Sequence, residues 1–206
     1  MPDIAKSKRR ERGNSILEFA FVAIPTVILM LGVVVLGINL GRSVEVAQVA
    51  RDGGAMFVRG LDFTQTGNQQ VLVRIAGPLN LQLTGGDGLA SMSKITFIPD
   101  ASCGTPTDAS YPDCTAGKNV LMQRIVFGNT TLPGTHYVTV GSVTFDSQGN
   151  VANYATNPNA VISNFASTLQ LKPLEISYVT EAYFQTPDVN MQGFLSNTGI
   201  YSQAFF

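Results

Sequence analysis

The sequence predicts an α+β fold, in which a long N-terminal helix, first transmembrane and then amphipathic, precedes a small extracytoplasmic domain with an antiparallel sheet. Residues 19–41 contain no charged side chain, and as a helix they would be roughly 35 Å long, enough to cross a hydrocarbon layer. Beyond residue 41, apolar residues recur at spacings of three and four. Several later segments alternate with a period of two and are rich in β-branched and aromatic residues.

These patterns divide the chain into three parts. Residues 1–13 form a basic leader on the cytoplasmic side, residues 14–60 form the helix, with its transmembrane part at about 19–41, and residues 61–206 form the extracytoplasmic α+β domain. We expect the helix to end or bend at the pair Gly53 and Gly54, or to continue weakly to Gly60, because glycine weakens a helix.

Charge is scarce and unevenly distributed. Only 13% of the residues are charged, against roughly 25% in average soluble proteins, which favours a membrane segment or an uncharged polar surface. Beyond Gly13, eight basic and twelve acidic side chains remain, a net charge of −4, so nucleic acid is not expected as a partner. The first twelve residues hold five of the thirteen basic side chains: Lys6, Lys8, Arg9, Arg10 and Arg12.

The basic cluster also predicts the orientation of the helix. An excess of positive charge before an apolar segment keeps the N-terminus in the cytoplasm and sends the following body across the membrane. A cleaved secretory signal is an alternative, but its apolar core would be shorter, roughly 7–15 residues. Pro25 lies inside the apolar run and removes one helical hydrogen bond, so we expect a bend there.

Glu18 lies at the edge of the apolar run, where an ionised carboxylate is costly unless it is paired or reaches the interface. It could simply lie among the lipid headgroups. Alternatively, cleavage between Gly13 and Asn14 would create a protonated amine on Asn14, one helical turn from Glu18. The carboxylate could then neutralise this amine or that of a neighbouring subunit.

The whole string resembles a known family. A basic leader that ends in Gly13, four residues, the acid-aromatic pair Glu18 and Phe19, and a long apolar helix look like the prepilin-peptidase site of the Flp (type IVc) pilins. The continuation, EFAFVAIPTVILMLGVVVLGINLG and then AQVARDGGAMFVRG, is similar to the TadE-like minor pseudopilins of tight-adherence systems. The resemblance covers residues 8–60. Asn14 departs from the type IVa and type II pattern, in which the first mature residue is usually Phe or Met.

The resemblance implies a minor pilin subunit with a pilin-like body. Prepilin peptidase would cleave after Gly13, and the helix would join other pilin or pseudopilin subunits during pilus assembly, secretion or adhesion. The protein would reside in the bacterial inner membrane with its body in the periplasm, or outside the cell within a pilus. The alternative is an unprocessed, single-pass anchored binding module in which Glu18 has no special role.

The sequence also predicts a helix contact at one pair of glycines and a disulfide between the two cysteines. Gly37 and Gly41 form a GxxxG pair that would admit a close helix neighbour. Cys103 and Cys114 lie in a loop-like stretch, where a disulfide is the preferred interpretation and two free thiols are the alternative. A zinc site is not expected, because the single His136 cannot complete a set of four ligands.

The body contains no motif of an enzyme, cofactor site or metal site: Walker loop, HExxH, CxxC and a Ser-His-Asp order are all missing. Asp87 and Asp146 lie in glycine-containing turns and are expected to shape those turns rather than to bind calcium. We therefore expect neither catalysis nor a cofactor.

The sequence also predicts the helices and strands of the body and the position of its C-terminal tail. The C-terminal aromatic residues Tyr201, Phe205 and Phe206 are expected to dock on the sheet or, alternatively, to form a subunit contact. The other predicted elements are a helix over 68–83 disturbed by Pro78, strands at 94–99, 120–128, 136–146 and 174–185, and a short helix over 157–171.

Overall fold

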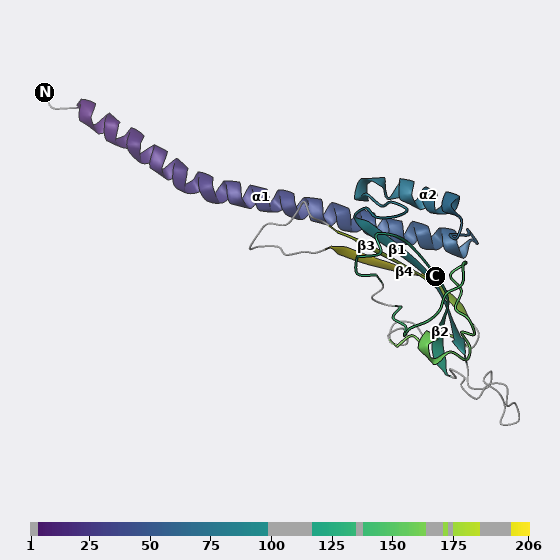
Figure 1. Cartoon of the computed structure of the whole chain (residues 1–206). Helices are drawn as coiled ribbons and strands as arrows, with labels where there is room; N and C mark the ends of the chain where they lie inside the picture. The colour runs from purple at the N-terminus through teal and green to yellow at the C-terminus, as the bar shows by residue number, and fades with distance from the viewer. Residues whose placement is uncertain (1–3, 99–116, 135–137, 164–170, 173–174, 186–198) are drawn as a thin grey trace, which may run out of the picture. The chain divides into compact units, whose positions relative to one another are not determined.

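The computed structural model (Figure 1) describes residues 4–98, 117–134, 138–163, 171–172, 175–185 and 199–206, with residues 4–15 described only as helical backbone. The chain divides into two compact units, Met1–Gly41 and Arg42–Phe206. The elements in chain order are α1 (Ile4–Val58), α2 (Thr66–Ile75), the 3-10 turn η1 (Gly77–Leu79), β1 (Gly88–Ile98), β2 (Lys118–Gly128), the 3-10 turn η3 (Pro158–Ala160), β3 (Ile176–Phe184) and β4 (Ile200–Phe205).

The predicted α+β class is confirmed. The second unit contains a four-stranded sheet in the order β2-β1-β3-β4, in which every neighbouring pair is antiparallel. β1 and β3 are therefore the central strands, and β4, at the C-terminus, forms one edge (Figure 1).

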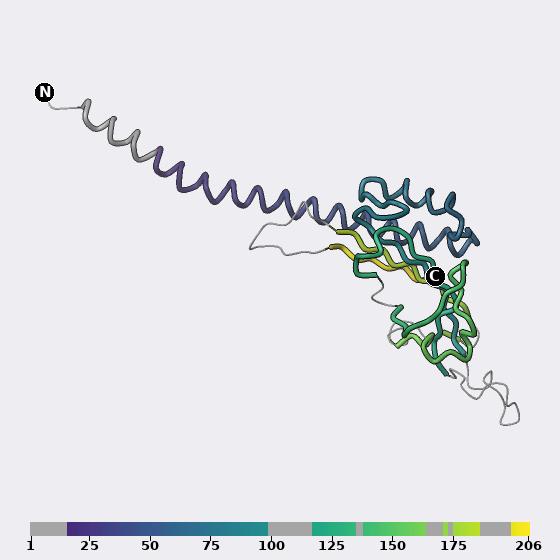
Figure 2. The backbone as a smooth tube through the Cα atoms, viewed as in Figure 1, coloured from purple at the N-terminus to yellow at the C-terminus, as the bar shows by residue number. Residues whose placement is uncertain are grey.

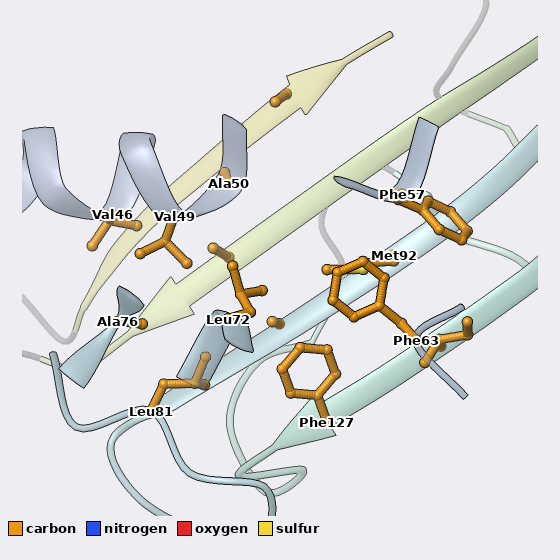
Figure 3. Packing of buried hydrophobic residues seen from close by; sticks show 14 of the residues in the cluster. Val46, Val49, Ala50, Phe57, Phe63, Leu72, Ala76, Leu81, Met92 and Phe127 are labelled. Carbon is orange, nitrogen blue, oxygen red and sulfur yellow. The ribbon is translucent and has the colours of Figure 1, made fainter. Parts of the chain in front are cut away.

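One face of the sheet packs against the C-terminal part of α1 and against α2. Strand residues of alternating position, such as Met92, Phe127 and Ala182, contribute to one buried cluster with residues of both helices. Figure 3 shows Phe57, Phe63 and Phe127 side by side at one end of this cluster. The ring of Phe63 stacks on Phe127 with centroids 6.2 Å apart and meets Phe57 edge-on at 6.2 Å. This cluster is the main hydrophobic core of the body.

The amphipathic pattern of α1 is confirmed in part. Val49 and Ala50 are buried against the sheet, together with Val46, whereas Val44 is 57% exposed. The buried positions are three and four residues apart, as expected for a helix with one apolar face. The predicted amphipathic helix is therefore confirmed from Val46 onward.

The predicted end of the helix at Gly53 and Gly54 is wrong, because α1 continues to Val58, in agreement with the alternative prediction of a helix that continues toward Gly60. Both glycines are buried, and a Cβ atom at Gly53 would lie 3.0 Å from Met92 Cε and 3.2 Å from a methyl carbon of Leu72. A Cβ at Gly54 would lie 3.0 Å from the hydroxyl of Thr180 on β3. The pair therefore lets the helix lie close to the sheet and to α2, at the cost of some helix propensity.

The helix ends instead in a Schellman motif around Gly60. The amide of Leu61 donates to the carbonyl of Met56 at 3.1 Å, and that of Gly60 donates to Phe57 at 3.0 Å. Gly60 has φ +86°, a left-handed conformation that glycine adopts without strain. Leu61 and Met56 both pack against the main core, which is the hydrophobic contact that usually accompanies this motif.

α2 confirms the helix that begins near residue 68 and the effect of Pro78. The helix ends at Ile75, and Pro78 lies in the first turn of η1, where its missing amide hydrogen is not needed. Asn80 then reverses the chain in the left-handed region, with φ 54°. The predicted helix over 68–83 is therefore correct in its first half only.

The second face of the sheet is covered by irregular chain. Val138, Val151, Ala160 and Ile162 pack with strand residues such as Leu121 in a second buried cluster. Figure 2 shows this part of the chain, in green, beside β2. The amides of Val151 and Ile162 donate to the carbonyls of Met122 and Asn119, and that of Arg124 donates to Gly149. The outer edge of β2 is therefore partly hydrogen-bonded, which protects it from pairing with another chain.

Two predicted elements are wrong in this region. The predicted strand at 136–146 is irregular from residue 138 on, with one isolated bridge between Phe145 and Val151. Its alternating valines serve to cover the sheet instead of joining it. The predicted helix at 157–171 is wrong over residues 157–163, which contain the turn η3 and then Val161 in extended conformation, bridged to Val120; residues 164–170 lie outside the described residues.

The predicted strands at 94–99, 120–128 and 174–185 are confirmed as β1, β2 and β3, but β1 starts earlier, at Gly88. The aromatic tail docks on the sheet, as predicted: β4 pairs with β3 in the register Tyr183↔Tyr201 and Val179↔Phe205. Phe205 packs against the second cluster, and Phe206 remains 44% exposed.

Candidate membrane segment and processing site

The described chain contains one helix that is long and apolar enough to span a membrane by length and composition, the part of α1 from Ile16 to Val58. No residue in the most apolar part of this helix is buried within the structure. Large apolar side chains are exposed on all sides of this segment, for example Phe21 at 73% and Leu29 at 71%. Such exposure is unfavourable in water and favourable in lipid, so this segment can serve as a membrane anchor.

Pro25 lies within the helix, which continues on both sides of it. Proline has no amide hydrogen, so it cannot donate to the carbonyl of Phe21, one turn earlier. The hydroxyl of Thr26 donates to the carbonyl of Val22 at 2.7 Å, a local bond that serine and threonine often make in helices. The predicted bend stays a prediction.

The four residues of the predicted processing site all lie in α1. Gly13 and Asn14 belong to its backbone, and their side-chain environment lies outside the described residues. Glu18 and Phe19 are exposed, Phe19 by 74%. In a helix, Asn14 and Glu18 are one turn apart and share a face, so an amine created at Asn14 would lie within reach of this carboxylate.

The remaining predicted residues are either open to solvent or lie outside the described part. An added Cβ at Gly37 or Gly41 would meet no atom within 4 Å apart from the nearby backbone of α1 itself, so both positions have room for a neighbouring helix. Cys103 and Cys114 lie outside the described residues, and the disulfide stays a prediction.

A buried polar cluster in the body was missed at the level of the sequence. Glu181, on β3, is only 1% exposed, and its carboxylate accepts a hydrogen bond of 2.5 Å from the hydroxyl of Tyr201 on β4. The same hydroxyl lies 3.1 Å from the side-chain oxygen of Gln203. Ser91 on β1 is the register partner of Glu181 and is also buried. The signal was present, because Glu181 is the only charged residue in the apolar segment ISYVTEAYF.

Arg124 on β2 supplies the opposite charge on the same face of the sheet. Burial lowers the pKa of its guanidinium, and the nearby carboxylate of Glu181 partly offsets this effect. Its Nη2 donates to the carbonyl of Val138, and its Nε donates to the hydroxyl of Ser93 at 3.4 Å. These bonds join the strands to the irregular chain that covers the sheet at Val138. They also supply the hydrogen bonds that a buried charge requires, so the cluster has a structural role.

The two aspartates of the glycine-containing turns have structural roles, as predicted. Asp146 accepts hydrogen bonds from the amides of Gln148 and Asn150 and from the Asn150 side chain, at 2.8 to 2.9 Å. These bonds, first those from Asn150, lower the pKa of the Asp146 carboxyl. Asp87 accepts a bond of 2.8 Å from the side chain of Asn80. Both carboxylates thus close turns in the body.

Among the described residues, no three His, Cys, Asp or Glu side chains come together in a group that could hold a metal ion. Comparisons of the chain with models of protein families, with curated proteins and with solved structures found no match. The membrane-capable part of α1, with Glu18 at its beginning, therefore remains the feature on which a function can be argued.

Proposed function

We propose that this chain is a minor pilin or pseudopilin subunit of a tight-adherence (Flp) type IV pilus, made as a precursor and cleaved between Gly13 and Asn14. The observation that carries the proposal is the exposed apolar stretch of α1, which has Glu18 as its acid at the N-terminal edge and the basic leader before it. The body would lie in the periplasm, or outside the cell within a pilus, and the single helix would anchor the chain in the inner membrane.

The electrostatic argument gives Glu18 its role. A carboxylate in an apolar surrounding is stabilised by a cation nearby, and Asn14 is one turn away in α1. Cleavage converts the amide nitrogen of Asn14 into an ammonium group. The ammonium group and Glu18 then neutralise each other, within one helix or between neighbouring subunits, where water is scarce.

The proposal is tested by intact mass and N-terminal sequencing of the protein from its native host. Loss of residues 1–13 is the expected result. Gly13→Ala should block this loss, because the peptidase reads the last leader residue. Retention of residues 1–13 in the unmodified protein would contradict the proposal and favour the unprocessed, membrane-anchored binding module.

The role of Glu18 is tested separately. Glu18→Ala should leave cleavage largely intact but reduce incorporation into pili, since the positive N-terminus would lack its partner. The matched control is Glu45→Ala, which removes an exposed acid of the same helix beyond the apolar stretch and should leave incorporation unchanged. Equal pilus assembly by the Glu18 variant and the control would remove the role assigned to Glu18.

A further inference from the structure

Four residues that differ from their apolar surroundings follow one another along α1 at intervals of seven: Glu18, Pro25, Gly32 and Asn39. Seven residues make almost two turns of an α-helix, so these positions lie on one side of α1, with a drift of about 20° per step. We call this side the heptad seam. Lipid solvates hydrocarbon side chains well, but it offers little to polar groups, and such groups in membrane helices usually face other protein.

The heptad seam also contains a backbone group that needs a partner in lipid. Because Pro25 cannot donate, the carbonyl of Phe21 loses its helical hydrogen bond, and Phe21 lies on the seam, three residues after Glu18. The nearest side-chain donor, the hydroxyl of Thr26, donates instead to the carbonyl of Val22. An unsatisfied carbonyl in hydrocarbon is strongly unfavourable, so this side of the helix is less suited to lipid than to contact with protein.

Gly32 and Asn39 determine what kind of neighbour fits. Apart from the nearby backbone of α1 itself, no atom lies within 4 Å of a Cβ built at Gly32, so a second helix can approach its backbone closely. The amide of Asn39 has both donors and an acceptor and can therefore pair with the same amide of a parallel copy. Copies of one chain insert into a membrane in the same direction, which makes their helices parallel.

We propose that the heptad seam of α1 packs in parallel against the heptad seam of a second copy of this chain, with the left-handed crossing that a seven-residue repeat imposes. The inference rests on the membrane insertion in the proposed function and names the helix partner. Glu18 of each copy then lies near the other, and the ammonium groups created at Asn14 compensate the two carboxylates. Gly37, about 140° around the helix from Gly32, lies away from this contact.

The contact can be mapped by photo-crosslinking of the full-length protein in its native membranes. A photoreactive residue is placed either at Ile28, on the seam, or at Met30, on the other side; these side chains are 64% and 69% exposed within one chain. The expected result is a crosslinked homodimer from position 28 and little from position 30. Equal yields, or a stronger yield from position 30, would overturn the proposal.

Two glycines of the same helix give a matched pair of variants. Gly32→Leu should abolish the crosslink from position 28, whereas Gly37→Leu should leave it, although both positions are equally open within one chain. Asn39→Leu should weaken association by roughly three- to thirty-fold, and Asn39→Gln should largely retain it. Loss of the crosslink in Gly37→Leu with retention in Gly32→Leu would assign the contact to the opposite side.

Membrane fractionation of the same samples separates the two proposals. If the chain is absent from the membrane fraction, the proposed function fails and this inference fails with it. If the chain is in the membrane but crosslinks without preference for the heptad seam, only the inference fails.

Discussion

Tyr201→Phe removes one oxygen atom and tests how the C-terminal strand is held. The hydroxyl donates to the buried carboxylate of Glu181 at 2.5 Å. Hydrogen bonds to charged groups contribute about 1.5–3 kcal/mol, and phenylalanine keeps the ring packing, so we expect the free energy of unfolding to fall by about 2 kcal/mol. For a domain of this size, that corresponds to a lower melting temperature by about 4–8 °C.

The assay is thermal unfolding of the full-length protein in detergent micelles, followed by circular dichroism. Tyr154→Phe is the matched control, because no hydrogen bond of the Tyr154 hydroxyl is seen among the described residues, and it should change stability by less than about 0.5 kcal/mol. A double-mutant cycle with Glu181→Gln should give a coupling of about 0.5–3 kcal/mol. A loss in Tyr201→Phe no larger than in the control, together with zero coupling, would refute the reasoning.

Two further predictions concern the turns and the start of β1. The pKa of Asp146 should lie below its ordinary value of 3.8, and Asn150→Ala should raise it; carbon-detected NMR titration measures both. Since the folded pKa is lowered, the stabilisation from Asp146 is present above the unfolded pKa and is lost as the pH falls through the folded pKa. Gly88→Ala should destabilise the body by about 1–3 kcal/mol, because its Cβ would overlap the buried ring of Phe184, whereas Gly134→Ala, with its nearest atom at 3.7 Å, should not; urea unfolding distinguishes them.

The sequence was informative wherever a segment had one consistent environment. The apolar stretch of α1 has exposed large apolar side chains on all sides and no charged residue from 19 to 41, so its length and composition alone made it recognisable. β2 and β3 carry large apolar residues at alternating positions and were predicted within a few residues. The predicted helix end at Gly53 and Gly54 is wrong because glycine can either weaken a helix or allow close packing, and the sequence does not show which. The close neighbours Met92 and Leu72 show that Gly53 allows close packing.

The missed parts depend on contacts between distant segments. The first half of β1 was not predicted because it contains small residues, such as Ala90, Ser91 and Ser93, which suit a central strand covered on both faces but have no strong strand propensity. The valines at 138 and 140 alternate like a strand but cover the second core as irregular chain. A periodic pattern predicts which side chains are buried, and it does not decide whether the backbone pairs with a sheet.

The body and the proposed membrane functions can be tested independently. Within α1, the buried residues of the core begin at Val46, and the described side chains before Arg42 contribute none. Substitutions at Glu18 or Gly32 should therefore leave the unfolding of the body unchanged, whatever they do to processing, association or assembly. A variant at either position that lowered the stability of the body would show that the apolar part of α1 has a role in folding. Its assembly defect could then no longer be attributed to a lost charge pair or a blocked helix contact.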